Sequence, residues 1–240
     1  MRPGKTITHA TRGCRPRALR GPLTVALMCL VVACGAGSGA IIEVADFRDD
    51  FQSPTPAAGW SYLWNENGAI GDAANYDDLG WNGNRYDSDG DSQFPDPSPA
   101  RYVMINANGG HPGCPEAGGQ LHDRFAIAGY SVEETAEYSI SDSLFENSAD
   151  GGDGVELKIY VNNTEARGEI LPDQGSTTFD MVLGELTAGD TIYVAMGPRD
   201  GDSYDTTQLD FTINQVPEPT AAGLVILAAL AFLGRPRQRT

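Results

Sequence analysis

The clearest evidence for the fold of this 240-residue chain is the stretch Val155-Glu156-Leu157-Lys158-Ile159-Tyr160-Val161. Its four aliphatic residues alternate with Glu156, Lys158 and Tyr160. In an extended chain the four aliphatic side chains therefore all point to one side. A period of two predicts a β-strand that buries one face and leaves the other in contact with solvent. The fold is therefore expected to contain a sheet with a core against one of its faces.

Similar patterns recur on both sides of this stretch and predict further short strands. They lie at Ile41–Phe51, Gly59–Trp64, Arg101–Ala107, Leu121–Ala128, Glu137–Phe145, Thr177–Leu183, Thr191–Met196 and Gln208–Ile213. Turns rich in Asp and Gly separate many of them, at 150–154, 172–175, 188–190 and 197–201. No convincing helical period occurs between 41 and 215. The pattern predicts an all-β domain over 41–215, a two-sheet antiparallel sandwich of the jelly-roll kind, with a long Gly-, Asp- and Asn-rich loop over 66–99.

The C-terminal residues 216–240 have three parts in a fixed order. Val216-Pro217-Glu218-Pro219 is followed by an apolar run, Ala221–Leu233, and then by three arginines near the end of the chain. Arginines that follow an apolar segment stay on the cytoplasmic side of a membrane, which places the preceding chain outside. As a helix this run is roughly 20 Å long, whereas the hydrocarbon core is about 30 Å thick. A short, processable transmembrane helix is therefore expected.

This tail resembles a PEP-CTERM sorting signal, which bacterial exported proteins made alongside extracellular polysaccharide carry. The resemblance covers 216–240 only. It implies that an exosortase-type membrane enzyme recognises Pro217, Glu218 and Pro219 and removes the tail. It also implies transient anchoring in the inner membrane through the C-terminal segment, followed by residence at the cell surface or in the extracellular matrix.

The N-terminal residues 1–40 have the features of a secretory signal peptide. Residues 1–22 contain six basic and no acidic residues, and Leu23–Ala33 is an apolar core of suitable length. Ser38-Gly39-Ala40 offers small residues for cleavage. A lipoprotein-type cut before Cys34 is the alternative, because Val31-Val32-Ala33-Cys34 resembles a lipobox. Both alternatives lead out of the cytoplasm.

Charge and cysteine content restrict the remaining domain. Residues 41–215 hold seven basic and thirty-two acidic residues, a formal charge near −25. Such a field repels nucleic acid and anionic lipid, so a phosphate-binding role is excluded, while divalent cations such as calcium are favoured. Cys114 is the one cysteine in this range, so no disulfide can form within it. The fold must depend on its core and, at most, on a metal ion.

A second resemblance extends over most of the domain. Its motifs are Gly59–Tyr62, Gly110–Gly113, Gly152–Val155, Gly189–Ile192 and Thr207–Ile213. Their order is similar to that of galactose-binding-type jelly rolls, the architecture of many carbohydrate-binding modules. The resemblance implies a structural calcium ion that links the first and last strands, and by position its ligands would be Glu43, Asp46 and Asp210.

Four residues are candidate glycan ligands. Trp64 belongs to the alternating row Trp60, Tyr62 and Trp64, which either stacks on sugars or packs in the core. Trp81 and Tyr86 flank Asn82-Gly83-Asn84-Arg85, where rings and amides together could bind a polyol. His111 lies in the Gly110–Gly113 loop. A zinc site using His111, Cys114, His122 and Asp123 is an alternative that lacks the usual paired-ligand spacing.

No catalytic residue can be nominated from the sequence, because it contains no nucleophile elbow and its many acids guarantee chance pairs. The sequence therefore favours a non-enzymatic exported protein that binds glycan or forms part of a matrix. Two alternatives stay open: a polysaccharide hydrolase or lyase on a jelly-roll scaffold, and an adhesive surface protein with no small ligand.

Overall fold

A computed structural model of the protein describes residues 40–88, 102–113 and 122–217. The chain divides into two compact units, Met1–Ala36 and Gly37–Thr240, and every described residue belongs to the second unit. The predicted signal peptide, apart from Ala40, and the sorting signal after Pro217 lie outside the described residues. Within the described ranges, no helix has the length and apolar character needed to cross a membrane.

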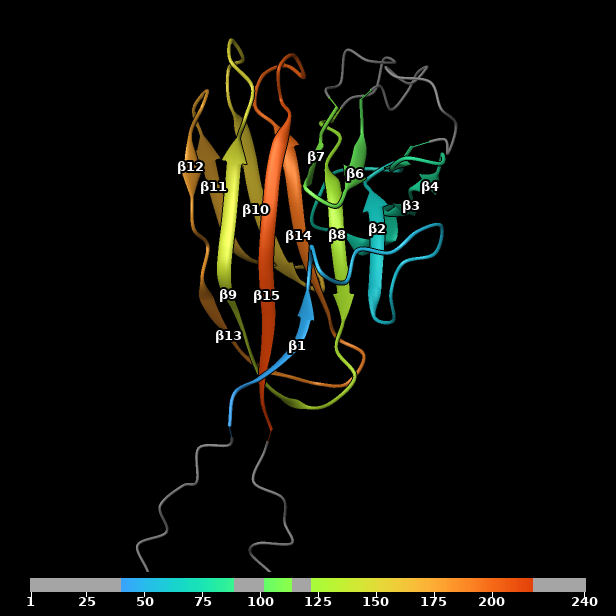
Figure 1. Ribbon diagram of the computed structural model, residues 1–240, viewed down its shortest axis with the longest axis vertical. Helices are drawn as coiled ribbons and strands as arrows, with labels where there is room; N and C mark the ends of the chain where they lie inside the picture. Colours follow the sequence, from blue (N-terminus) through green and yellow to red (C-terminus); the bar gives the residue numbers. More distant parts are fainter. Residues whose placement is uncertain (1–39, 89–101, 114–121, 218–240) are drawn as a thin grey trace, which may run out of the picture. The chain divides into compact units, whose positions relative to one another are not determined.

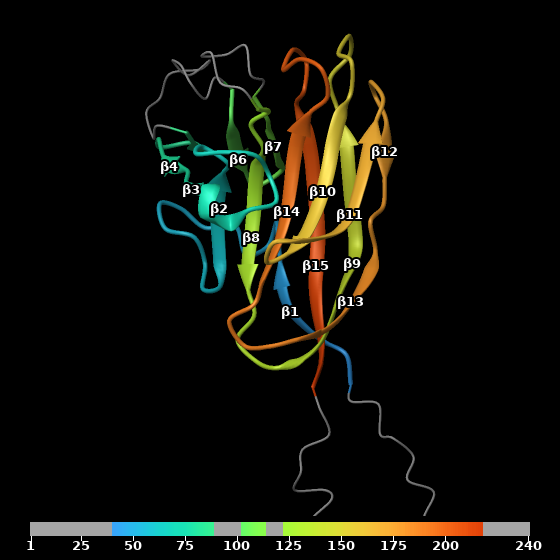
Figure 2. The same ribbon diagram turned by 180° about the vertical axis from the view of Figure 1, so that it is seen from behind.

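The strands form two antiparallel sheets that pack face to face (Figures 1 and 2). The first sheet has the order β12-β9-β15-β7-β6-β5-β4, with β1 also paired to β15 and β13 to β9. Its strands are β1 (Ile42–Asp46), β4 (Gly80–Trp81), β5 (Tyr86–Asp87), β6 (Met104–Asn106), β7 (Gly109–His111), β9 (Ala136–Asn147), β12 (Ser176–Thr177), β13 (Met181–Leu186) and β15 (Thr207–Pro217).

The second sheet has the order β11-β10-β14-β8-β2-β3. Its strands are β2 (Trp60–Trp64), β3 (Asp77–Asp78), β8 (Ala126–Ser131), β10 (Val155–Val161), β11 (Thr164–Leu171) and β14 (Thr191–Pro198), and a short 3₁₀ helix η1 (Ala73–Asn75) precedes β3. The predicted all-β, two-sheet antiparallel sandwich is confirmed.

The stretch over 155–161 forms β10 with the predicted bounds, in the interior of its sheet between β11 and β14. Val155, Leu157 and Ile159 are fully buried between the sheets. Tyr160, expected on the solvent face, is also buried, and its ring lies against Gly71. The segment that contains η1 therefore contacts the outer face of this sheet, where Phe125, Ile127 and Ala195 form a second small cluster.

Some expectations need correction. The stretch over 66–99 is no featureless loop, since its described part contains η1, β3, β4 and β5. The strand expected over 177–183 is split between β12 and β13. The final strand continues to Pro217, which pairs with Ala136, so it is longer than the strand expected over Gln208–Ile213.

Aromatic side chains fill the centre of the core. Phe211 from β15 stacks on Phe47 at 5.5 Å between ring centroids, and Trp60 from β2 meets Phe211 edge to face at 5.7 Å. Each pair joins residues that are far apart in sequence. Such pairs contribute about 0.5–1.5 kcal/mol beyond the area they bury. The aromatic cluster thus packs Phe47, which directly follows β1, and Phe211 of β15 against β2 of the opposite sheet.

The two ends of the sandwich differ in what they carry. Ile42 of β1 pairs with Gln215 of β15, so the domain begins and finishes at the same end (Figure 1). At the other end of β15, Thr207 pairs with Asn147 of β9, which brings the β9–β10 loop (148–154) and the β14–β15 loop (199–206) side by side. The Ser148 amide donates to the Thr206 carbonyl at 2.9 Å. We call this end the loop end.

Candidate functional site

The alternating aromatic row lies in the core, not on a ligand-binding surface. Trp60, Tyr62 and Trp64 are only 6 %, 2 % and 3 % exposed, and all point from β2 to the space between the sheets. The core interpretation of the row is therefore confirmed. The prediction of Trp64 as a glycan ligand is wrong, because its ring has no face left for a sugar.

Tyr86 is also buried, which corrects its prediction as a ligand. It is 2 % exposed, its hydroxyl donates to the Gln52 carbonyl at 2.6 Å, and its ring centroid lies 4.8 Å from that of Tyr62. Burial raises the pKa of the Tyr86 hydroxyl. Trp81, on β4, is half-buried against Tyr86 and lines a hollow of about 420 Å³ with Pro54. Of the three predicted aromatic ligands, Trp81 keeps accessible surface.

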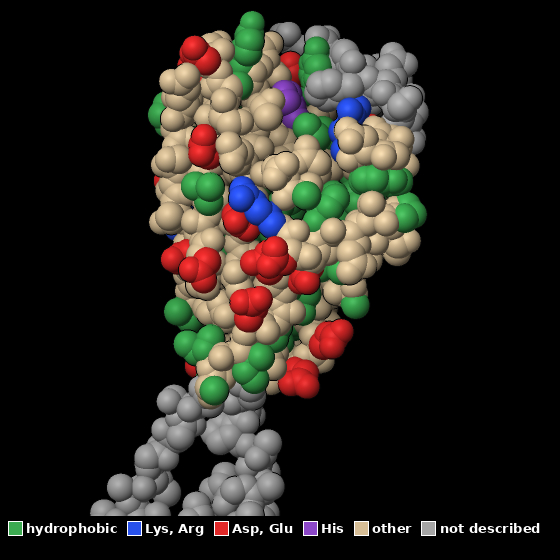
Figure 3. All heavy atoms as spheres, in the orientation of Figure 1, with side chains coloured by type: hydrophobic (Ala, Val, Ile, Leu, Met, Phe, Trp, Pro, Cys, Tyr) green, Lys and Arg blue, Asp and Glu red, His purple; other side chains and the backbone are tan. Residues whose placement is uncertain are grey.

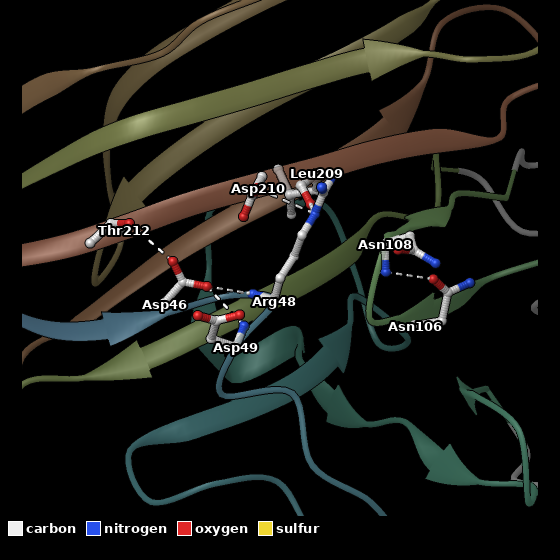
Figure 4. A network of polar contacts seen from close by, with 8 residues as sticks. All are labelled: Asp46, Arg48, Asp49, Asn106, Asn108, Leu209, Asp210 and Thr212. Carbon is white, nitrogen blue, oxygen red and sulfur yellow. Dashed lines mark hydrogen bonds and ion pairs between the residues drawn. The ribbon is translucent and has the colours of Figure 1, made fainter.

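The three predicted calcium ligands on the first and last strands have different surroundings, which Figure 4 shows for Asp46 and Asp210. Arg48 forms an ion pair with Asp210 at 3.4 Å and donates to the Leu209 carbonyl. Asp46 accepts from the amide of Arg48 at 3.0 Å, from Asp49 and from the hydroxyl of Thr212. Glu43 is exposed. The Arg48 guanidinium thus pairs with one of the three predicted ligands, Asp210.

Among the described residues, no group of three or more His, Cys, Asp or Glu side chains could hold a metal ion. His122 contacts the buried guanidinium of Arg124, whereas His111 contacts the carbonyl of Pro112. Cys114 lies outside the described residues. The two histidines of the alternative zinc site, His111 and His122, therefore contact different partners.

A hollow of about 410 Å³ opens at the loop end. Its walls combine residues that the sheet pairing brings together: Tyr102 before β6, His111 at the end of β7, Ala149 from the β9–β10 loop, and Asp202, Ser203, Tyr204 and Thr206 from the β14–β15 loop. Figure 3 shows acidic side chains spread over much of the face in view, with basic ones at few places. The hollow has aromatic, hydroxyl, imidazole and carboxylate groups within one small volume.

Two tyrosines on the walls of this hollow have a strained backbone. Tyr102 has φ 71° and Tyr204 has φ 67°, in the left-handed region that bulky residues seldom adopt. Tyr204 is 61 % exposed, which is unusual for an aromatic ring. Strained residues persist where the surrounding structure holds them, and they cluster at binding sites. The hollow therefore carries two tyrosines with strained backbone, one of them largely exposed.

His111 is the predicted ligand residue that the structure places on this wall. Its Nδ1 lies 2.6 Å from the Pro112 carbonyl, which can only accept, so Nδ1 carries a proton. The ring centroid of Tyr102 lies 5.3 Å from that of His111. Burial lowers the pKa of His111, and the imidazole is therefore neutral at pH 7.

The β14–β15 loop contains two buried aspartates that sequence reasoning did not identify as site residues, and one of them, Asp202, lines the hollow. Asp202 is 8 % exposed and Asp205 is 0 % exposed. Neither oxygen of Asp205, nor Oδ2 of Asp202, has a hydrogen-bond partner among the described residues. Burial, with the nearby charges of Asp153 and Asp202, raises the pKa of Asp205 from 3.8 to about 8. Their Asp-Gly-Asp-Ser context is that of an ordinary turn, so composition alone gave no signal.

Comparisons with known proteins give distant structural likenesses only. No family model and no curated protein matches the chain. One similar solved structure is the C-terminal family 6 carbohydrate-binding module of LamC, a laminarinase from the marine bacterium Zobellia galactanivorans. It is 13 % identical, covers 49 % of this chain and 91 % of the module, and has a TM-score of 0.26.

A second is the exo-β-1,3-galactanase of Phanerochaete chrysosporium with β-1,3-galactotriose. It is 12 % identical, covers 74 % of this chain and 29 % of the enzyme, and has a TM-score of 0.24. Both TM-scores are below 0.5, so the fold assignment rests on the sheet pairing described above. The class that this pairing defines is an antiparallel β-sandwich with a polar and aromatic hollow at its loop end.

Proposed function

We propose that the protein is an exported, non-enzymatic β-sandwich that binds extracellular glycan through the loop-end hollow. The observation that carries the proposal is the pair of strained tyrosines, Tyr102 and Tyr204, on the walls of one hollow. Aromatic rings stack on the apolar faces of sugars, and neighbouring polar groups bind their hydroxyls. Asp202, Ser203 and Thr206 line the same hollow and supply such groups.

The charge of the domain restricts the glycan. Residues 41–215 carry a formal charge near −25. A field of this sign repels polyanions, so the ligand is a neutral polysaccharide in preference to an acidic one.

The position of the hollow suits a surface protein. The first and last strands of the domain meet at the end of the sandwich opposite the loop end, and the eleven residues of β15 span roughly 35 Å between the two ends. A membrane segment after Pro217 would anchor the end opposite the loop end. The hollow would then face away from the membrane, toward the extracellular polysaccharide.

Affinity electrophoresis of the full chain in gels that contain neutral or acidic polysaccharides tests the binding. We expect a neutral glycan to retard the wild type and Tyr204→Ala to lose the retardation. Ile170→Ala is a matched control, because Ile170 is an exposed apolar residue (56 %) on β11. Loss of retardation in Trp81→Ala alone would move the site to the hollow at β4, and mobility unaffected by every glycan would refute the proposal.

Export and sorting are tested in the producing cell. We propose that residues 1–40 direct secretion and that an exosortase-type enzyme removes the tail after recognising Pro217, Glu218 and Pro219. Fractionation should find the wild type outside the cell in a shortened form. Glu218→Ala should leave the full-length form in the inner membrane. Recovery of the intact wild type from the cytosol would overturn this part of the proposal.

A further inference from the structure

The β9–β10 and β14–β15 loops bury a carboxylate that lacks the partners its charge requires. Asp205 is 0 % exposed, and neither of its oxygens has a hydrogen-bond partner among the described residues. Asp202 is nearly as buried, and its Oδ2 also has no partner there. Burial of an ionised carboxylate without hydrogen bonds or an opposite charge is costly. A bound cation would offset this cost.

The space beside Gly152 brings oxygen atoms to one point. The position that a Cβ would occupy on Gly152 lies 3.0 Å from the Ser203 carbonyl oxygen, 3.4 Å from Asp205 Oδ1 and 3.4 Å from the Tyr204 carbonyl oxygen. These three oxygens thus lie close together on the side of Gly152 where any other residue would place its side chain. We call this group of one carboxylate oxygen and two main-chain carbonyl oxygens the Gly152 cradle.

Further oxygens lie around the Gly152 cradle. A hollow of about 330 Å³ is lined by Gly151, Gly152, Asp153, Gly201, Ser203 and Tyr204. Asp153 Oδ2 lies 3.7 Å from the Cβ position of Gly201. The nearest basic residue of these loops, Arg199, is directed to the Asp153 carbonyl at 3.2 Å and to the exposed Asp200 at 4.0 Å. The buried negative charge of Asp205 therefore gains no ion pair from it.

We propose that the Gly152 cradle binds one calcium ion. Asp205 and the carbonyls of Ser203 and Tyr204 are its first ligands, and the nearby charges of Asp153 and Asp202 add to the negative field at the site. Calcium prefers six to eight oxygen ligands in flexible geometry and accepts main-chain carbonyls beside carboxylates. Magnesium demands a near-ideal octahedron, and zinc prefers nitrogen and sulfur. The use of main-chain oxygens explains why no cluster of side chains reveals the site.

The proposal is independent of the glycan hypothesis, but it has a consequence for that hypothesis. The Tyr204 carbonyl faces the cradle, whereas Tyr204 also lines the loop-end hollow. Calcium would therefore hold the β14–β15 loop in the conformation that presents the Tyr204 ring. If glycan binds as proposed above, removal of calcium should weaken it.

Thermal unfolding of the full chain, stripped with EDTA and then titrated with CaCl₂ or MgCl₂ alone, tests the site. Calcium-binding extracellular modules have dissociation constants of about 10⁻⁴–10⁻³ M, so 10 mM calcium should raise Tm by about 3–10 °C. The same concentration of magnesium should raise it much less. This measurement involves no glycan, so failure of the glycan hypothesis leaves it unchanged.

Two variants locate the ion. Asp205→Asn removes the charge with little change in shape, and Gly152→Ala places a methyl group in the cradle. Both should lower calcium affinity at least tenfold. Asp210→Asn is the matched control, because Asp210 belongs to β15, outside the two loops, and pairs with Arg48. This variant should keep the calcium response. A response lost in Asp210→Asn but kept in Asp205→Asn and Gly152→Ala would overturn the proposal, as would the absence of any calcium response in the wild type.

Discussion

The buried carboxyl group of Asp205 should make the stability of the domain fall as pH rises when calcium is removed. Its pKa is raised from 3.8 in the unfolded chain to about 8 in the folded one. Between these values the folded state keeps a proton that the unfolded state has lost, so the free energy of unfolding decreases with pH. Each pH unit is worth at most about 1.36 kcal/mol, which gives up to about 4 kcal/mol between pH 5 and pH 8.

Urea denaturation in EDTA, repeated across this pH range for the wild type and Asp205→Asn, measures the effect. We expect the wild type to lose about 2–4 kcal/mol relative to the variant as pH rises from 5 to 8, because relaxation at the loop end reduces the full value. Asp180→Asn is a control that should show no pH dependence in this range. Hydrogen bonds from Ser143 lower the pKa of Asp180, so its stabilising effect is constant between pH 5 and pH 8 and is lost only below about pH 4. Parallel stability curves for the wild type and Asp205→Asn would show that the folded domain does not raise the pKa of Asp205.

Three further substitutions test the packing of the sandwich by chemical denaturation. Phe211→Ala should destabilise the domain by about 3–5 kcal/mol, because it empties the space between Phe47 and Trp60; a loss below about 1 kcal/mol would contradict the aromatic core. Gly197→Ala should cost about 1–3 kcal/mol, since its Cβ would lie 2.1 Å from the Phe125 ring, and Phe125→Leu in the same chain should recover part of the loss. Val182→Ala, at a side chain that is 77 % exposed, should change stability by less than about 0.5 kcal/mol.

The long strands were predictable because one of their faces is buried and the other is not. β10 and β9 alternate in burial along most of their length, and the sequence alternates with them. β11 escaped prediction because most of its residues are exposed, so burial leaves no alternating pattern. The two-residue strands β3, β4 and β5 are too short to have a period, and tertiary contacts fix them.

The candidate site was predictable only in part. His111 could be suspected from its loop, and the hollow does include it. Tyr86 looked like a surface aromatic because its sequence neighbours are polar, whereas the alternation that includes Trp64 fitted both a sugar-binding row and a core strand; the sheets enclose both side chains. Asp205 and Gly152 belong to loops far apart in the chain, and the pairing of β9 with β15 brings them together. No short-range pattern records that pairing.

Hydrogen–deuterium exchange of the full chain, with and without a neutral polysaccharide that retards it in gels, locates the glycan-binding surface. If glycan binds at the loop end, amides at 102–111, 148–154 and 199–206 should exchange more slowly when the polysaccharide is present. Amides beside Trp81 should exchange as before. Protection confined to the neighbourhood of Trp81, or spread evenly over the domain, would contradict the assignment of ligand binding to the loop end.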